Sequence, residues 1–433
     1  MKDETTSRGA GAGDQTDQST SEDDHALIHY ASPITLPKSR PTWAEINLDN
    51  LTHNFNVMKA AVSPNTAIMP AVKADAYGHG AVVCATALER AGAGWFGVAL
   101  PEEGLKLRDA NITRPILCLG GFWEGQEELV INRRLTPALF RLDLLERLDR
   151  AASAARVVAD YHLKVDTGMG RLGVPYAELA SFLDGAARFQ NVKLDGVMTH
   201  FASADVPEKK EFTERQLSLF ESAVEMVRER GHRPAWIHGA NSAASHAYPR
   251  AHGNMIRIGG VLYGLWRDVT SPDVAALDWR PVMSLHTRVM LLKTVPANTP
   301  LGYGGTFVTG QESRVATLPI GYEDGLRRSL SNRGRVIVRG RFAPIIGRVS
   351  MDLTLIDVTG VPGVTTGDEV LIIGSQGMSQ ISAEEIAGDL GTLSYEITCG
   401  ISERVPRITA GGRSHDPANE PGFKKPLVTD KES

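Results

Sequence analysis

The sequence predicts an α/β fold, a (β/α)8 barrel of the TIM type followed by a mainly β C-terminal domain. The first observation is a series of about eight short apolar segments that alternate with helical patterns over residues 39–279. Such alternation implies a parallel sheet, and eight units in about 220 residues suit a closed barrel. The second observation is a change after residue 280, where β-like segments are closely spaced and long helices are absent. We therefore expect a barrel over residues 39–279 and a β domain over residues 280–411. The pattern alone leaves an open doubly wound sheet as the alternative to the barrel.

Local patterns justify the elements of the barrel. Residues 43–48 alternate apolar and polar side chains, which predicts a strand. Asp49 is a candidate cap for the helix that we expect over residues 50–60. Two amphipathic segments, 144–154 and 209–230, predict helices on the outside of the barrel. The candidate barrel strands are 67–73, 95–99, 115–119, 136–140, 157–165, 193–199, 234–238 and 255–258.

The β domain has its own signals. Turn residues separate four β-like segments, and Ser382-Ala-Glu-Glu385 is a capping box that opens one helix. The predicted strands of this domain are 288–295, 314–320, 335–338 and 369–373.

Composition excludes several classes of protein. Hydrophobic residues make up 42% of the chain and charged residues 22%, as in ordinary soluble enzymes. The net charge of −5 and the lack of a basic block argue against a nucleic-acid partner. No apolar run is long enough to span a membrane. Cys84, Cys118 and Cys399 are far apart and odd in number, so we expect no metal site and no disulfide framework. Free cysteines of this kind fit a reducing cytoplasm.

The two ends of the chain differ from the rest. Residues 1–38 are rich in Ser, Thr, Asp and Gly, acidic residues outnumber basic ones, and there is no apolar core of a secretory signal. This composition predicts a disordered acidic extension. Residues 412–433 carry prolines and mixed charge, and we expect an exposed tail.

The most informative stretch is Ala67-Ile-Met-Pro-Ala-Val-Lys73-Ala-Asp-Ala-Tyr77-Gly-His-Gly80. It is an apolar strand that ends in a lysine, and two glycines then open the next helix. The carboxyl ends of barrel strands form the active-site face. A lysine there, among apolar residues, loses its proton more easily and can form a Schiff base with an aldehyde such as pyridoxal phosphate (PLP). Position alone favours a plain surface lysine at a strand end.

Other polar groups follow the later strands. Arg171 lies in a glycine-rich loop and could bind a carboxylate in a bidentate fashion, or it could pair with Asp166 on the same loop. His200 ends the next strand, where a lone histidine is more often structural. The last two strands lead into His-Gly-Ala-Asn241-Ser242 and Arg-Ile-Gly259-Gly260. Barrels often bind phosphate at these loops, although a glycine pair alone is more often a turn.

Ala-Val-Lys73-Ala-Asp-Ala-Tyr-Gly-His-Gly resembles the PLP-attachment signature of alanine racemases, and the resemblance runs in order from about Thr42 to Ile408. It implies the barrel and β-domain architecture, with the N-terminal strand often joining the second domain. It implies that Lys73 binds PLP and that His200 relays hydrogen bonds to Arg257. In alanine racemases the lysine that matches Lys164 is commonly carbamylated and orients the arginine that matches Arg171. The residues that the resemblance places around PLP are Lys73, Tyr77, His200, Asn241, Ser242, Arg257, Gly259, Gly260 and Tyr395.

Arg257 is placed by the resemblance on the pyridine nitrogen of PLP. Most PLP enzymes use a carboxylate there, which keeps the ring nitrogen protonated. A cationic arginine cannot accept that proton. The ring is then a weaker electron sink, which suits an enzyme that only moves one proton.

The β domain contributes a second group of residues by the same resemblance. Tyr303, in a glycine-flanked turn, is implied as the second catalytic base, and its alternative is an exposed aromatic in a hairpin. Tyrosine has an ordinary pKa of about 10, so it needs nearby positive charge such as the Arg257–His200 relay could supply. The residues implied at the substrate pocket or its entrance are Arg171, Tyr322, Met351 and Asp352.

The resemblance thus implies a PLP-dependent isomerase that interconverts L- and D-alanine with two bases, supplying D-alanine for peptidoglycan in a bacterial cytoplasm. Lys73 would serve the D isomer and Tyr303 the L isomer, in a homodimer with shared sites. A racemase of broader specificity, acting for example on serine, is an open alternative. A PLP-dependent decarboxylase shares the architecture, and a PLP-carrier protein resembles the barrel alone.

Overall fold

The computed structural model describes residues 40–270 and 272–411. The acidic extension that we expect over 1–38 and the tail over 412–433 lie outside the described residues. In the part of the chain that is described, no helix is both long enough and apolar enough to cross a membrane.

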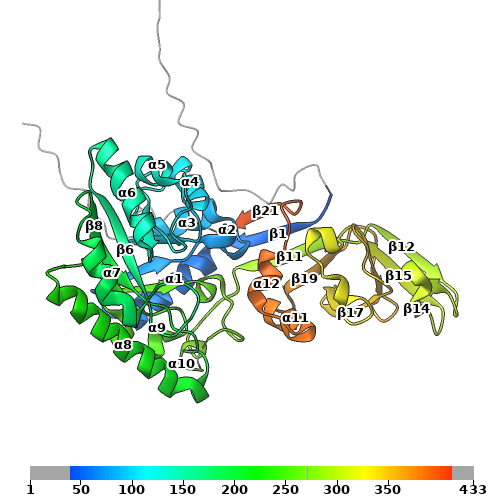
Figure 1. The fold of residues 1–433 in the computed structure, drawn as a ribbon. Coiled ribbons are helices and arrows are strands. Elements are labelled where there is room, and N and C mark those ends of the chain that lie inside the picture. The colour runs from blue at the N-terminus through cyan, green and yellow to red at the C-terminus, as the bar shows by residue number, and fades with distance from the viewer. Residues whose placement is uncertain (1–39, 271, 412–433) are drawn as a thin grey trace, which may run out of the picture. The chain divides into compact units, whose positions relative to one another are not determined.

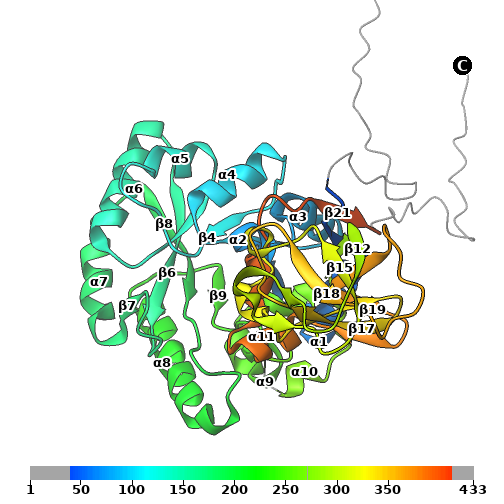
Figure 2. The same ribbon diagram turned by 90° about the vertical axis from the view of Figure 1, so that its right-hand side faces the viewer.

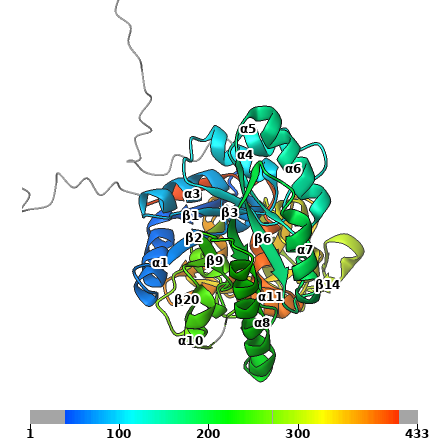
Figure 3. The same ribbon diagram turned by 60° about the vertical axis from the view of Figure 1, so that its left-hand side comes forward.

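Eight parallel strands form a closed barrel (Figure 3). Six of them hydrogen-bond in the order β3-β4-β5-β6-β8-β9, and β10 pairs with β2. The ring closes because Ala71, just after β2, bridges to Gly97 of β3, and because the amide of Asn254, before β10, donates to the carbonyl of Ile237 in β9. The strands are β2 (Ala67–Pro70), β3 (Phe96–Val98), β4 (Ile116–Cys118), β5 (Thr136–Leu139), β6 (Ala159–Asp166), β8 (Val192–Met198), β9 (Trp236–His238) and β10 (Met255–Ile258). The predicted barrel is confirmed, and the open sheet is not formed.

Helices surround this ring of strands (Figure 3). The two predicted amphipathic helices are present as α6 (Leu142–Ala155) and α8 (Lys210–Glu229). The others are α1 (Leu48–Ala61), α3 (Ala81–Arg90), α4 (Pro101–Asp109), α5 (Glu127–Asn132), α7 (Leu179–Ala186), α9 (Ala244–Ala247) and α10 (Pro272–Ala275), together with the short strand β7 (Val174–Pro175) beside β6. The segment labelled α2 (Lys73–Tyr77) is a left-handed turn and not a regular helix.

Helix α1 begins two residues earlier than predicted. Its N-cap is Asn47, whose side-chain oxygen accepts a hydrogen bond from the amide of Asn50 at 2.9 Å. The expectation that Asp49 caps this helix is therefore wrong. Asn47 ends the preceding strand in an extended conformation, and that conformation is the one that an N-cap residue needs.

The interior of the barrel is filled rather than hollow. Six buried side chains form one apolar layer inside the strands. They come from different strands or from the residues next to them: Met69, Trp95, Leu117, Ala138, Met198 and Met255. The polar side chains of the barrel that could take part in a reaction therefore lie outside this layer, apart from a few histidines that interrupt it.

A ten-stranded sheet makes up the β domain (Figures 1 and 2). The N-terminal strand β1 (Trp43–Asn47) belongs to it and lies between β11 and β21. The remaining strands are β11 (Met283–Arg288), β12 (Leu291–Val295), β15 (Ser313–Leu318), β16 (Arg335–Val338), β17 (Arg341–Ile346), β18 (Thr354–Asp357), β19 (Glu369–Gln376), β20 (Ser379–Ile381) and β21 (Arg407–Ala410). A separate hairpin is formed by β13 (Pro300–Leu301) and β14 (Phe307–Val308), and two helices are α11 (Ala383–Leu390) and α12 (Ser394–Cys399).

One predicted strand of this domain is wrong in its limits. Residues 288–295 were expected to be continuous, but β11 ends at Arg288 and β12 begins at Leu291. The chain changes partners here, because β11 pairs with β19 while β12 pairs with β15. Only half of the predicted capping box is formed: the Ser382 hydroxyl accepts from the amide of Glu385 at 3.1 Å, whereas the Glu385 carboxylate accepts from Arg335.

Candidate active site

Lys73 lies where strand β2 gives way to a turn of unusual conformation. The four residues after it, Ala74 to Tyr77, have φ between 51° and 55°. Left-handed backbone costs about 1–2 kcal/mol for each residue that is not glycine, so other contacts must hold this turn. The carboxylate of Glu103 accepts from the amide of Ala74 at 2.7 Å and from the amide of Ala99 at 2.6 Å. Glu103 thereby ties the residue after Lys73 to the neighbouring strand.

A buried histidine, His79, stabilises the same turn. Nδ1 of His79 lies 2.9 Å from the carbonyl of Ala76 and 3.0 Å from that of Tyr77. Since both partners are acceptors, Nδ1 carries the proton. Burial lowers the pKa of His79 to about 4, so the ring is neutral. The Tyr263 hydroxyl donates to the carbonyl of Ala71 at 2.9 Å and fixes the chain just before Lys73.

The surroundings of Lys73 favour its neutral amine. Burial lowers the pKa of its ammonium, and the positive charge of Arg171 lowers it further. The ammonium nitrogen lies 5.9 Å from the centre of the Tyr77 ring. A lowered pKa leaves a larger fraction of the amine unprotonated near neutral pH, and only the unprotonated amine can act as a nucleophile or a base.

Arg257 is a buried guanidinium without a carboxylate partner in the described part of the chain. It is 6% exposed. It donates to the carbonyls of Thr199 at 2.7 Å, His238 at 2.8 Å and Gly239 at 3.0 Å. Burial lowers its pKa to about 9, so it keeps its charge at neutral pH.

Two histidines also face the guanidinium of Arg257. It lies 2.8 Å from Nδ1 of His238 and 3.4 Å from Nδ1 of His200. Burial, followed by the charge of Arg257, holds the pKa of both histidines well below the usual value. Nε2 of His238 lies 2.9 Å from Nδ1 of His162, which is also buried and has its pKa lowered to about 3, first by burial. The result is a row of neutral imidazoles beside one fixed positive charge.

Gly259 and Gly260 follow β10 and face two tyrosine hydroxyls. A Cβ atom on Gly259 would overlap the hydroxyl of Tyr77, and one on Gly260 would overlap that of Tyr395. The two tyrosine rings meet edge to face, with centres 5.0 Å apart. Two hydroxyls above two side-chain-free residues make a small polar cradle, which suits an anion such as phosphate.

Asn241 and Ser242, which follow β9, make different contacts. The side-chain oxygen of Asn241 accepts from the amide of Ala244 at 3.0 Å and so caps α9. The Ser242 hydroxyl instead accepts from the amide of Gly259 at 2.9 Å. The Ser242 hydroxyl is therefore turned towards the cradle and not towards the start of α9.

Lys164 and Arg171 lie near one another and near Lys73. Lys164 is 5% exposed, and its pKa is lowered to about 8 by burial and then by the charges of Arg257, Arg171 and Lys73. The carboxylate of Asp166 accepts from the amides of Gly168 and Gly170. No ion pair joins Asp166 to Arg171 among the described residues, which leaves the Arg171 guanidinium for another anion.

The β-domain residues are arranged differently. The side chain of Tyr303 is 72% exposed, at the tip of the β13–β14 hairpin. Met351 is 50% exposed and Tyr322 is 39% exposed, while Asp352 accepts from Arg404 at 2.7 Å. A single chain therefore assembles Lys73, Arg257 and the cradle, but it does not bring Tyr303 to Lys73.

Sequence reasoning did not single out Glu103, His162, His238 or Tyr263. Each of them contacts the site or the turn that bears Lys73. The available signal was weak: His162 and His238 are polar residues within apolar strands, and Glu103 lies on the first turn of the exposed helix α4.

Two family models match the chain. The model of the alanine racemase N-terminal domain matches residues 46–266, and that of the alanine racemase C-terminal domain matches residues 282–409.

Curated proteins and solved structures match as well. The alanine racemase of Halothermothrix orenii is 45% identical over 371 residues, which cover 85% of this chain and 97% of the relative. The alanine racemase structure from Streptomyces lavendulae has a TM-score of 0.80 at 36% identity and covers 87% of this chain and 98% of that one. The structure from Bartonella henselae, with covalently bound pyridoxal phosphate, has a TM-score of 0.76 at 28% identity and covers 86% of this chain and 100% of that one. On the evidence of both domains, this chain belongs to the alanine racemase family, whose members are isomerases.

Proposed function

We propose that this protein interconverts L- and D-alanine with PLP as its cofactor and supplies D-alanine for peptidoglycan. The observation that carries the proposal is Arg257, a buried cation held by three backbone carbonyls and two neutral histidines. A site built around this cation suits a cofactor ring whose nitrogen is unprotonated, because the guanidinium can only donate.

The residues around Lys73 fit PLP. Lys73 supplies an amine of lowered pKa for the aldehyde. The hydroxyls of Tyr77 and Tyr395 lie so close to Gly259 and Gly260 that a Cβ on either glycine would overlap them, and these two hydroxyls are candidates to bind the phosphate. When bound, PLP withdraws electrons and stabilises the negative charge that forms on the substrate α-carbon when its proton leaves.

Two bases on opposite faces of the α-carbon are the simplest way to invert it. Lys73 exchanges the proton on the face of the D isomer, and Tyr303 from a second copy of the chain does so on the face of the L isomer. Nη2 of Arg257 faces Nδ1 of His200 at 3.4 Å, which favours the tautomer with the proton on Nε2, and that Nε2 could donate to the tyrosine oxygen. This bond stabilises the phenolate that Tyr303 needs in order to act as a base. Arg171 is free to bind the carboxylate of the substrate.

Lys164 is a candidate for carbamylation. The ammonium would lose one proton, and the neutral amine would then add to carbon dioxide and lose a second proton, so that a buried cation becomes an anion. Three positive charges, Arg257, Arg171 and Lys73, favour that change. The carbamate oxygens would then accept from Arg171 and orient it. Labelling with ¹³C-bicarbonate should give a carbamate resonance in the NMR spectrum that is absent from Lys164→Ala.

A homodimer in the cytoplasm completes the proposal. The exposed Tyr303, Tyr322 and Met351 have no substrate-binding function unless another molecule faces them. All three cysteines are free, which suits a reducing compartment.

The test is the conversion of L-alanine by the purified protein with added PLP, followed by chiral chromatography. Formation of D-alanine supports the proposal. Release of carbon dioxide would instead indicate a decarboxylase, and no turnover of any amino acid would favour a PLP carrier. The same assay with serine and other small amino acids measures the breadth of specificity.

A further inference from the structure

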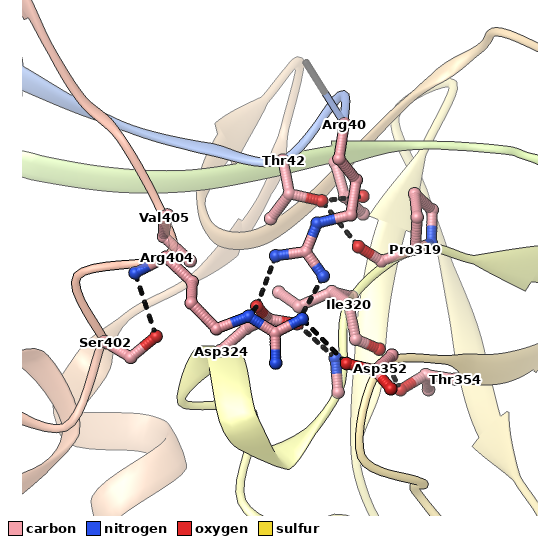
Figure 4. A network of polar contacts seen from close by, with 12 residues as sticks. Arg40, Thr42, Pro319, Ile320, Asp324, Asp352, Thr354, Ser402, Arg404 and Val405 are labelled. Carbon is pink, nitrogen blue, oxygen red and sulfur yellow. Dashed lines mark hydrogen bonds and ion pairs between the residues drawn. The ribbon is translucent and has the colours of Figure 1, made fainter.

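Asp324 is a fully buried carboxylate that meets two arginines from distant parts of the chain (Figure 4). Arg40, ahead of β1, binds it with both terminal nitrogens, and Nη1 to Oδ2 measures 3.0 Å. Nε of Arg404, which precedes β21, lies 3.7 Å from Oδ1. The amide of Gly321 also donates to Oδ2, at 2.9 Å. The negative charge is thus paired and hydrogen-bonded, as a buried charge must be.

Arg404 joins this carboxylate to a second one. Its Nη2 donates to Asp352 at 2.7 Å, while its Nε faces Asp324 (Figure 4). Asp352 follows Met351 in the chain, and Asp324 lies two residues after Tyr322. One guanidinium therefore links the two segments on which the proposed substrate contacts lie.

Backbone bonds hold the same two segments together. The amide of Tyr322 donates to the carbonyl of Ser350 at 3.0 Å, and that of Glu323 donates to the carbonyl of Met351 at 3.1 Å. The approach is so close that a Cβ on Gly321 would overlap the Met351 carbonyl. This contact holds segments 319–326 and 350–354 in a fixed arrangement, and the buried carboxylate of Asp324 lies next to it.

We propose that Asp324 is a positioning residue for substrate binding. Paired with Arg40 and Arg404, it holds segments 319–326 and 350–354 in the one arrangement that places the Tyr322 ring and the Met351 amide at the substrate pocket. This inference rests on the proposed function and on the place of Tyr322 and Met351 at the substrate pocket, which the resemblance implies. Asp324 itself touches neither substrate nor cofactor and acts through these segments.

The test compares Asp324→Asn and Arg40→Ala with the wild type in steady-state racemisation of both isomers. The KM for alanine should rise about ten-fold or more in each variant while kcat falls less, since what is lost is binding rather than proton transfer. Arg40→Lys keeps the charge and should recover part of the loss. Arg250→Ala is the matched control, because it removes a bidentate ion pair between Arg250 and Glu221 of the outer helix α8. The KM of this variant should not change.

Hydrogen exchange read by mass spectrometry tests the inference without activity. Amides in 319–326 and 350–354 should exchange at least about ten-fold faster in both variants, while the barrel helices keep their protection. Unchanged KM together with unchanged exchange in these segments would overturn the inference. If Asp324→Asn does not fold, Arg40→Ala decides the question, because the Arg40 side chain is 28% exposed. A wild-type protein that does not racemise alanine contradicts the proposed function, and the exchange measurement still decides the role of Asp324.

Discussion

Arg257 donates to Nδ1 of His238 at 2.8 Å, and this single bond fixes the protons of two rings. Because Nδ1 of His238 must accept, its Nε2 carries the hydrogen. That hydrogen is donated to Nδ1 of His162, 2.9 Å away. The proton of His162 is therefore on Nε2, which has no hydrogen-bond partner among the described residues. Arg257 thus determines which nitrogen carries the proton in His238 and then in His162, two neutral rings that lead away from the site into the barrel.

Lys73→Ala should abolish the visible absorbance band of lysine-bound PLP, because Lys73 is the amine at the barrel mouth whose pKa is lowered by burial and by Arg171. Absorbance spectra of the purified variants provide the measurement. Lys106→Ala, on the exposed face of α4, is the control and should keep the band. A band that persists in Lys73→Ala would show that another lysine carries PLP.

His79 should make stability depend on pH. Its pKa is about 4 in the folded protein and about 6.5 when unfolded, so below pH 6.5 the unfolded chain binds a proton that the folded chain does not. The stabilisation by the neutral ring is present above pH 6.5 and is lost as the pH falls towards 4, by about 3 kcal/mol in all. Urea unfolding at several pH values measures this loss.

His79→Phe keeps a ring against Tyr263, which lies 4.7 Å from the imidazole centre, but it cannot titrate. The variant should be less stable at pH 7, because the carbonyls of Ala76 and Tyr77 lose the imidazole N–H as a donor. Its stability should also fall less steeply between pH 6.5 and 4. An equal slope in both proteins would show that other groups are responsible for the pH dependence.

The sequence predicts the strands of the barrel better than it predicts the geometry of the site. Strand positions were predicted to within a few residues, because period and apolar content decide them. The turn after Lys73 could not be predicted: its left-handed residues are ordinary Ala, Asp and Tyr, and Glu103 and His79 hold it through tertiary contacts.

The network around Asp324 was missed for a related reason. Arg40, Asp324 and Arg404 are up to 364 residues apart, and nothing in their local sequence marks a buried ion pair. The break at Val289 was also missed, since an unbroken β pattern does not reveal a change of partner strand. What sequence patterns predict is local structure, and these features are set by which distant residues meet.

Two deletions at the N-terminus should have different effects. Removing residues 1–38 keeps Arg40 and should change kcat/KM by less than about two-fold, or about 0.4 kcal/mol. Removing residues 1–40 deletes one partner of the buried Asp324 carboxylate and should raise the KM for alanine. Steady-state kinetics of the two truncated proteins provide the comparison. Equal and large losses in both would show that the extension itself has a structural or regulatory role.

Tyr303→Phe keeps the ring but removes the acidic hydroxyl. Exchange of the α-proton of L-alanine with deuterated solvent should collapse, whereas exchange from D-alanine should survive better because Lys73 remains. Mass spectrometry of the recovered substrate measures both rates. Tyr176→Phe, outside the proposed site, is the control and should leave both unchanged. Equal loss in the two directions would argue for a single base.

Complementation between two inactive variants tests whether each site uses two chains. Tyr303 is 72% exposed in one chain, so we expect it to face Lys73 of a second copy across a two-fold axis. Lys73→Ala and Tyr303→Phe are unfolded and refolded together in equal amounts. Random pairing makes about half of the dimers mixed. In a mixed dimer, one site combines both lesions, while the other joins the intact Tyr303 of the first variant to the intact Lys73 of the second. Activity should therefore recover to about a quarter of the wild-type value.

If each site used both residues from the same chain, every site would keep one lesion. No recovery despite confirmed subunit exchange would then contradict the shared site.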